Sequence, residues 1–205
     1  MKKVGVLGGT FNPPHIGHLI VANEVKHALG LDEVRLMPTA IPPHKKASGD
    51  ATADQRLRMV NLAVKDLQGL TASAFEVDRG GISYTFDTME QLTKKEPNVE
   101  FYFIIGGDNI DILSKWYRIE ELVKIVKLVG IGRPGSVGES NFPIIMVNTP
   151  QIELSSTLIR QRFTVNGTVQ FLIPPPVELF IREEGLYGSC SAEERNIQPY
   201  AKRTL

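Results

Sequence analysis

A segment near the N-terminus that contains glycines and histidines constrains the fold of this chain more than any other feature. Residues 8–18, Gly-Gly-Thr-Phe-Asn-Pro-Pro-His-Ile-Gly-His, directly follow an apolar run, residues 4–7, that is typical of a buried strand. They precede a helical pattern with four apolar residues on one face: Leu19, Ala22, Val25 and Leu29. A glycine-containing turn from strand to helix is where α/β proteins hold phosphates on free backbone N–H groups. The segment therefore predicts nucleotide binding.

Two histidines, His15 and His18, stand three residues apart where this helix should begin. At that spacing both lie on one side of the first turn, beside the positive end of the helix dipole. We expect Gly17 to leave room for a ligand, and the imidazoles to stabilise an anion whose charge grows during a reaction. The alternatives are an ordinary tight turn with surface histidines, and a zinc site. The zinc site lacks a third ligand at a suitable spacing, so we expect no metal held by protein side chains.

The size and charge of the chain limit what it can bind. With 205 residues, of which 42% are hydrophobic, it can bury a full core. We expect one domain over residues 1–188, with a helical part from about 150, and a polar tail over 189–205. The 23 basic residues balance the 23 acidic ones, so the formal charge is zero. This balance argues against a general attraction to nucleic acid or to anionic lipid.

Cysteine content and hydropathy point to one compartment. Cys190 is the single cysteine, which excludes an intramolecular disulfide and fits a reducing environment. No apolar stretch approaches the roughly 20 residues of a membrane span. Lys2 and Lys3 lead directly into the first strand, without the long apolar run of a signal peptide. We therefore expect a cytoplasmic protein that binds no membrane.

Strand and helix patterns alternate along the chain, which predicts an α/β fold with a doubly wound, mainly parallel sheet. Further strands are expected at residues 34–37, 72–77, 101–105, 126–129 and 144–147. Helices are expected at residues 57–67, 84–95 and 119–124, after the serines at 155 and 156, and from the prolines at 174–176 to Gly185. This order makes the carboxyl ends of the strands the expected place for a ligand.

Two common kinds of nucleotide site do not fit. A P-loop needs Gly-Lys-Ser or Gly-Lys-Thr, and the chain contains no Gly-Lys pair. A dinucleotide fold for hydride transfer needs G-x-G-x-x-G and an acidic residue at the end of the second strand. That strand ends here in Leu-Met-Pro, residues 36–38, so a dehydrogenase is disfavoured.

Two motifs resemble those of a known superfamily. Residues 9–18 fit the pattern Gly-x-Phe-x-Pro-x-His-x-Gly-His and resemble the nucleotidylyltransferase signature. Residues 155–160, Ser-Ser-Thr-Leu-Ile-Arg, look like its second element, I-S-S-T-x-x-R, with Leu154 at the usual isoleucine. Within the superfamily the chain is most similar to the bacterial nicotinate-nucleotide adenylyltransferases. Their landmarks resemble residues 42–45, 83–88, 103–108, 115–117, 133–135 and 184–187.

The resemblance covers residues 1 to about 188 and implies a Rossmann-like fold with a small C-terminal helical subdomain. Two departures from the family pattern are visible. Asn12 stands where aspartate is common, and Gly107 stands where alanine is frequent. Neither removes one of the positive groups that carry charge in the motifs, so we expect altered affinity and retained activity.

The resemblance implies transfer of AMP from ATP to the 5′-phosphate of nicotinate mononucleotide. The products are nicotinate adenine dinucleotide and pyrophosphate, a step of NAD biosynthesis. The attacking phosphate is already an anion, so the protein supplies positioning and charge stabilisation. Mg²⁺ would be bound mainly through the ATP phosphates. No nucleic-acid partner is expected, and a homodimer would suit a compact metabolic enzyme of this size.

The resemblance also assigns site residues. The positive groups that stabilise charge are His15, His18, Lys45 and Arg160. The ATP-binding residues are Gly8, Gly9, Thr10, Phe11, His18, Gly106, Asp108, Arg133, Ser156, Thr157 and Arg160. The residues that bind nicotinate mononucleotide are Gly9, Thr10, Phe11, His15, Lys45, Thr85, Trp116 and Tyr117, with Trp116 stacked on the pyridine ring.

Each of these roles has a plainer alternative. Lys45 would otherwise be a solvated loop lysine, Arg160 a helix-surface charge, Asp108 a helix cap and Trp116 a core residue. The alternative functions are adenylyl transfer to nicotinamide mononucleotide or to pantetheine phosphate, and nucleotide binding without turnover.

Overall fold

The structure is a computed structural model that describes residues 1–42, 51–132 and 140–189. In these ranges the strands are β1 (Lys2–Gly9), β2 (Glu33–Pro38), β3 (Leu70–Ala72), β4 (Val99–Gly106), β5 (Lys127–Gly132) and β6 (Ile144–Asn148). They form one six-stranded sheet in the order β3-β2-β1-β4-β5-β6, with every pairing parallel. The carboxyl ends of all these strands therefore lie at one edge. The winding direction reverses between β1 and β4, which is where open sheets hold ligands.

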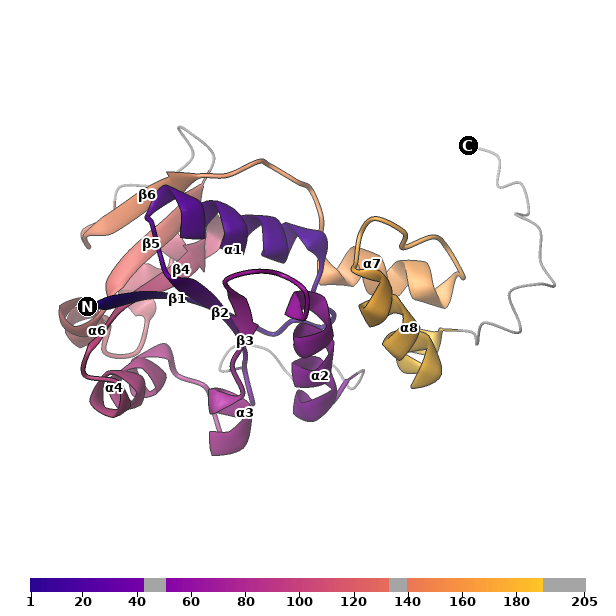
Figure 1. Cartoon of the computed structure of the whole chain (residues 1–205), viewed down its shortest axis with the longest axis horizontal. Helices are drawn as coiled ribbons and strands as arrows, with labels where there is room; N and C mark the ends of the chain where they lie inside the picture. Colours follow the sequence, from indigo (N-terminus) through magenta and orange to yellow (C-terminus); the bar gives the residue numbers. More distant parts are fainter. Residues whose placement is uncertain (43–50, 133–139, 190–205) are drawn as a thin grey trace.

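Helices cover both faces of the sheet. α1 (Ile16–Ala28) and α2 (Ala53–Val64) pack on one face, where Ala22, Val25 and Val60 meet Leu7 and Val34. α4 (Thr85–Lys95) and α6 (Ile119–Ile125) pack on the other, against the side chains of Val4, Val6, Phe101 and Phe103. Figure 1 shows α1 and α4 on opposite sides of the strands. Successive side chains of a strand point to opposite faces, which is why Val6 and Leu7 serve different cores. The predicted Rossmann-like, doubly wound fold is confirmed.

Two element predictions were wrong. Residues 75–77 were expected in a strand but lie in a short helix, α3 (Phe75–Arg79), and β3 ends at Ala72. Ser73 Oγ accepts from the Phe75 N–H at 3.4 Å at the start of this helix, and the Phe75 ring packs on the core shared with α4 and α6. The second error is at Leu67, which lies beyond the end of α2 and is 40% exposed. The apolar spacing of a helix continues to Leu67 in the sequence, but the helix ends at Val64 and the chain then turns toward β3.

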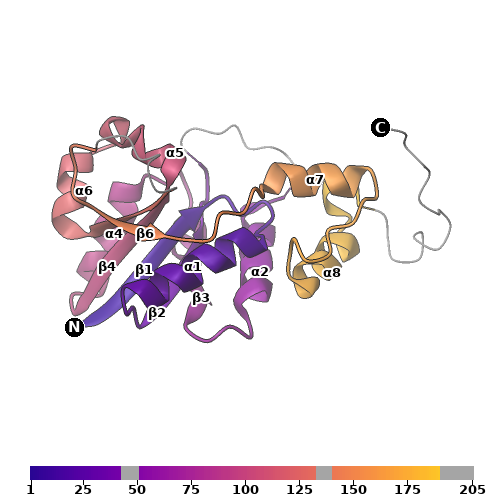
Figure 2. The same cartoon turned by 90° about the horizontal axis from the view of Figure 1, so that it is seen from above.

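The C-terminal part adds a third apolar cluster. α7 (Ser156–Thr164), α8 (Pro175–Glu183) and the 3₁₀ turn η2 (Leu186–Gly188) bury residues such as Ile159, Phe163 and Ile181 against Met59 of α2. Figures 1 and 2 show α7 and α8 beyond α2, at one end of the molecule. The predicted boundaries are found, since Ser155 Oγ accepts from the Leu158 N–H at 3.2 Å, α8 begins with proline, and Gly185 has φ 61°. The limits of the domain stay a prediction, and residues 190–205 lie outside the described ranges.

Two short elements follow β4: α5 (Gly107–Ile110) and the 3₁₀ turn η1 (Leu113–Lys115). Their residues were not assigned to helices by periodicity. In the parts of the chain that the structure describes, no helix is both long enough and apolar enough to cross a membrane.

Candidate functional site

The loop after β1 lies at the point where the sheet reverses direction. The register of β1 with β4 runs to Leu7 opposite Ile104, so Gly8 and Gly9 continue beside the end of β4. A Cβ on Gly8 would lie 3.1 Å from the Phe103 ring, and one on Gly9 would lie 3.2 Å from the Phe11 ring. Both positions therefore favour glycine, because an aromatic ring lies close to each.

Phe11 contributes to this loop through its backbone. Its φ is 50°, in the left-handed region that residues with side chains seldom adopt, and the residue is only 2% exposed. The ring meets that of His18 edge to face, with centroids 4.9 Å apart. Phe11 is therefore buried as a whole, and its side chain packs against His18.

The two histidines form a stacked pair at the start of α1. His15 is the N-cap residue, and its ring lies 3.6 Å from that of His18, centroid to centroid, with the planes 22° apart. His18 Nδ1 accepts a hydrogen bond from the His15 backbone N–H at 3.1 Å. That bond requires a free lone pair on Nδ1, so a neutral His18 carries its proton on Nε2. The pair thus presents a defined N–H donor beside a helix N-terminus.

Gly17 has a different role from the one expected. A Cβ at this position would lie 3.0 Å from His15 Nδ1. The glycine therefore makes room for the His15 ring. A side chain here would press on the His15 ring, so the stacking of the two imidazoles depends on the glycine.

The unliganded histidines are neutral at neutral pH, whereas the sequence led us to expect positive groups. Burial lowers the pKa of His15 to about 4. Burial, and secondly the nearby His15, lower the pKa of His18 well below its ordinary value. No described residue bonds to the buried His15 Nδ1. A bound polyphosphate would favour the protonated forms and raise both pKa values again.

The second motif docks on the first. Arg160 Nη1 donates to the Asn12 carbonyl at 2.8 Å, and Ser156 Oγ donates to the Pro13 carbonyl at 2.8 Å. Arg160 Nη2 also donates to Thr157 Oγ1 at 3.3 Å. The structure therefore brings the N-terminus of α7 beside that of α1, as Figure 2 shows for the two helices. Because the Ser156 hydroxyl is engaged with Pro13, an anion here would meet the backbone N–H groups of the first turn of α7.

The residues expected to bind a pyridine ring also come together. Thr85 begins α4, and the ring of its neighbour Tyr84 lies 5.0 Å from that of Tyr117. Trp116 is partly buried and meets Phe103 edge to face, with centroids 6.2 Å apart. The same Phe103 ring lies close to Gly8 at the end of β1. Trp116 packs against the core and is only partly buried.

Three expected site residues cannot be placed. Lys45 and Arg133 lie outside the described residues, and so does the side chain of Asp108. The backbone of residues 106–108 is clear: Gly106 caps α5 and Gly107 is its first residue. A Cβ on Gly107 would lie 3.3 Å from the Ile131 carbonyl, so the smaller residue avoids a tight contact with β5.

Sequence reasoning missed two residues behind the glycine loop. Tyr187 donates its hydroxyl to Asn12 Oδ1, which explains how the buried Asn12 is accommodated. Arg56 of α2, 4% exposed, donates to the Thr10 carbonyl at 2.9 Å. Tyr187 stood in a landmark of the family and offered a signal. Arg56 offered none, because a single arginine in an amphipathic helix is normally solvated.

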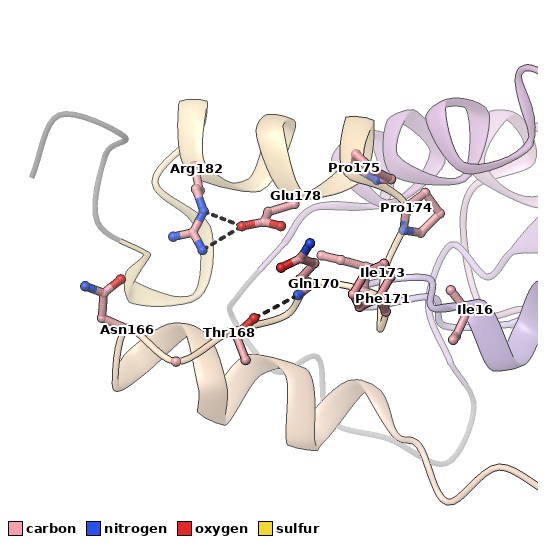
Figure 3. Close-up of a pocket in the computed structure, with 11 residues that line it drawn as sticks. Ile16, Asn166, Thr168, Gln170, Phe171, Ile173, Pro174, Pro175, Glu178 and Arg182 are labelled. Carbon is pink, nitrogen blue, oxygen red and sulfur yellow. Dashed lines mark hydrogen bonds and ion pairs between the residues drawn. The ribbon is translucent and has the colours of Figure 1, made fainter. Parts of the chain in front are cut away.

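A separate cavity of about 810 Å³ lies beside the C-terminal helices. It is lined by the α7–α8 connection, by α8 and by Ile16, and the ion pair of Arg182 with Glu178 forms one wall (Figure 3). Phe171 at its edge is 78% exposed. The glycines, the histidine pair and the aromatic residues described above do not line it.

Comparison with known proteins identifies close relatives. The family model described as cytidylyltransferase-like matches residues 6–162. A probable nicotinate-nucleotide adenylyltransferase of Bacillus mycoides (strain KBAB4) is 46% identical over 189 residues, which cover 92% of this chain and 100% of the relative. One from Bacillus cereus (strain Q1) is 47% identical over the same lengths.

Solved structures share the fold. Plasmodium falciparum nicotinic acid mononucleotide adenylyltransferase complexed with NaAD superposes with a TM-score of 0.77 at 19% identity, covering 93% of this chain and 99% of that one. A putative nicotinate-nucleotide adenylyltransferase from Vibrio parahaemolyticus gives a TM-score of 0.68 at 24% identity. The match covers 91% of this chain and 96% of that one.

Proposed function

Because the chain belongs to the cytidylyltransferase-like family, and within it to the nicotinate-nucleotide adenylyltransferases, we propose that it transfers AMP from ATP to nicotinate mononucleotide. The products are nicotinate adenine dinucleotide and pyrophosphate, so the reaction belongs to NAD biosynthesis. One observation carries the proposal from the structure. The N-termini of α1 and α7 are joined by the Arg160 and Ser156 bonds to the loop after β1, at the reversal point of the sheet.

The reaction is a substitution at the α-phosphorus of ATP. A phosphate oxygen of nicotinate mononucleotide forms a new bond to that phosphorus. The bond from the α-phosphorus to the bridging oxygen breaks, and pyrophosphate leaves with the electron pair. The nucleophile is already ionised, so no proton has to be removed. The protein accelerates the step by aligning two polyanions and by stabilising charge on the triphosphate.

We assign that stabilisation to the histidine pair and to Arg160. His18 Nε2–H and the first-turn N–H groups of α1 are donors beside the glycine loop. Arg160 of α7 brings its guanidinium to the same loop, where it donates to the Asn12 carbonyl. Lys45 and Arg133 are proposed to complete the charge around the phosphates, Asp108 to bind the adenosine ribose, and Trp116, Tyr117 and Thr85 to hold the pyridine ring.

Mg²⁺ belongs to the same proposal. In the residues that the structure describes, no three His, Cys, Asp or Glu side chains gather to form a cage. An ion bound mainly by ATP oxygens and water needs no such cage. When bound, it would neutralise part of the triphosphate charge. A homodimer and a cytoplasmic location are further parts of the proposal, supported by size and by the single cysteine.

Pyrophosphate release tests the function directly. ATP and Mg²⁺ would be supplied with nicotinate mononucleotide, nicotinamide mononucleotide or pantetheine phosphate in separate reactions. The proposal requires the highest kcat/KM with nicotinate mononucleotide. Faster release with either other acceptor would reassign the substrate, and no release with any of them would indicate nucleotide binding without turnover.

Trp116→Ala should raise KM for nicotinate mononucleotide about tenfold or more and leave KM for ATP within about twofold, because ring stacking is worth roughly 1–3 kcal/mol. Intrinsic fluorescence should also change when the mononucleotide binds, since Trp116 is the only tryptophan.

Phe171→Ala is the matched aromatic control for this variant, because that ring is exposed beside the separate cavity. It should change neither KM. If Trp116→Ala unfolds the protein or raises both KM values equally, Trp116 is a core residue and the pyridine pocket lies elsewhere.

A further inference from the structure

Arg56 is a buried cation held by backbone carbonyls. It lies on α2 with 4% of its surface exposed. Its Nη1 donates to the Thr10 carbonyl at 2.9 Å, and its Nη2 donates to the Ala40 carbonyl at 3.0 Å. Thr10 follows β1 and Ala40 follows β2, so one guanidinium bonds to the loops at the carboxyl ends of two adjacent strands.

We propose that Arg56 is a positioning residue for adenylyl transfer, which fixes the spacing and orientation of these two loops around the substrates. The inference rests on the proposed function for its kinetic consequence. The mechanical part, that Arg56 holds the two loops together, rests on the geometry alone.

Burying the charged guanidinium of Arg56 costs desolvation free energy. Burial lowers its pKa from the ordinary value, which marks the charged form as disfavoured there. Among the described residues, no carboxylate forms an ion pair with it. An apolar side chain of similar volume would avoid the desolvation cost. The guanidinium, however, is a rigid, planar group of N–H donors, and it bonds to two backbone carbonyls at once.

The loop after β2 is fixed on its other side as well. The Ala40 N–H donates to Ser83 Oγ at 3.0 Å, while its carbonyl accepts from Arg56. The Thr39 N–H donates to the Gly9 carbonyl at 2.9 Å, and the Ile41 N–H to the Gly81 carbonyl at 3.2 Å. Ala40 is therefore held at both ends of its backbone, and Arg56 connects it to the glycine loop.

The bond to Thr10 also orients the next amide. In a trans peptide the carbonyl and the N–H point in opposite directions. With the Thr10 carbonyl turned toward Arg56, the Phe11 N–H is turned away from it. Losing Arg56 would free this peptide to rotate, and a site that works by alignment loses rate when its donors are misplaced by about 1 Å.

The experiment compares two buried arginines. Arg56→Met keeps the side-chain volume but removes both donor groups, and Arg56→Lys keeps the charge but loses the fork. Arg182→Met is the matched control, because Arg182 is 7% exposed and pairs with Glu178 at 2.8 Å on the C-terminal helix α8. For each variant one measures the melting temperature, kcat, both KM values, and hydrogen exchange of the amides of residues 39–41.

Arg56→Met should lower kcat on the order of 10- to 100-fold and change each KM less than about threefold, with Arg56→Lys in between. Exchange at residues 39–41 should accelerate about tenfold or more in Arg56→Met and stay unchanged in Arg182→Met. Arg182→Met should lose melting temperature and keep kcat within about twofold.

Arg56→Lys preserves the test if Arg56→Met does not fold. Normal kcat together with unchanged exchange at residues 39–41 in a folded Arg56 variant would overturn the inference. Wild-type protein in the same assay separates the two claims. If it releases no pyrophosphate with nicotinate mononucleotide, the proposed function fails, and the exchange comparison still decides whether Arg56 holds the two loops.

Discussion

Replacing His18 with alanine is expected to lower kcat by a factor on the order of 10² to 10³, the usual loss for one preorganised donor at a developing charge. The imidazole is held in a single orientation by the His15 N–H at 3.1 Å and by the Phe11 ring. A donor fixed in this way acts mainly on the transition state, so kcat should fall more than KM rises. Steady-state pyrophosphate release over a range of ATP concentrations measures both constants.

His27→Ala is the control for this variant, because His27 is exposed on the last turn of the same helix. It removes an imidazole from α1 without touching the glycine loop. The role of His18 would be withdrawn if His18→Ala kept a near-normal kcat while its melting temperature showed a folded protein.

The main framework of the site could be predicted because it depends on local chemistry. The pattern of residues 8–18 marks a strand, a glycine turn and a helix start, and each of these forms from its own sequence. Alternation of strands and helices then orders the sheet, and parallel strands place all loops of one kind at one edge. The serine at 155 caps α7 for an equally local reason.

What could not be predicted depends on contacts between distant parts of the chain. The neutral state of His15 follows from its burial under residues that the local pattern does not specify. The true role of Gly17 depends on the rotamer of His15. Arg56 lies 46 positions from Thr10 in the sequence, and nothing in its helix distinguishes it from a surface arginine. The error over residues 75–77 has the same origin, because the core around Phe75 decides their structure.

The conformation of the loop after β1 is therefore fixed mainly by side chains of other elements. Four side chains from later elements bond to it: Arg56 from α2, Ser156 and Arg160 from α7, and Tyr187 from η2. Three of these bonds end on its backbone carbonyls. The glycines allow the loop its path, and the C-terminal helices hold it there. The side chains of α7 and η2 therefore fix this backbone from the C-terminal part of the chain.

Acidification should destabilise the folded protein through the same histidine pair. The folded pKa of His15 is about 4, whereas its ordinary value is 6.5, so between these values the unfolded chain binds the proton more readily. Stability is thus fully present above about pH 6.5 and is lost as the pH falls toward 4. The loss from His15 alone is about 2 kcal/mol between pH 7 and pH 5, and about 3 kcal/mol in full. His18 adds a loss of the same sign.

Urea unfolding of the wild type and of His15→Gln between pH 7 and pH 5 measures this effect. The variant should lose less free energy of unfolding over that interval, by about 2 kcal/mol. The raised pKa of Glu76 acts in the opposite direction, but it is common to both proteins and cancels in the comparison. The lowered pKa values of Glu33 and Glu96 act below this pH range.

His27→Gln, which removes an exposed imidazole from α1, should follow the wild-type curve. A second measurement adds ATP to each protein. A polyphosphate beside the histidine pair raises both histidine pKa values, so ATP should bind more tightly at lower pH. The stabilisation by ATP should therefore increase from pH 8 to pH 6 in the wild type and less in His15→Gln. Parallel curves for these two proteins, with and without ATP, would show that His15 is protonated equally in the folded and unfolded chain, and the buried, neutral pair would have to be abandoned.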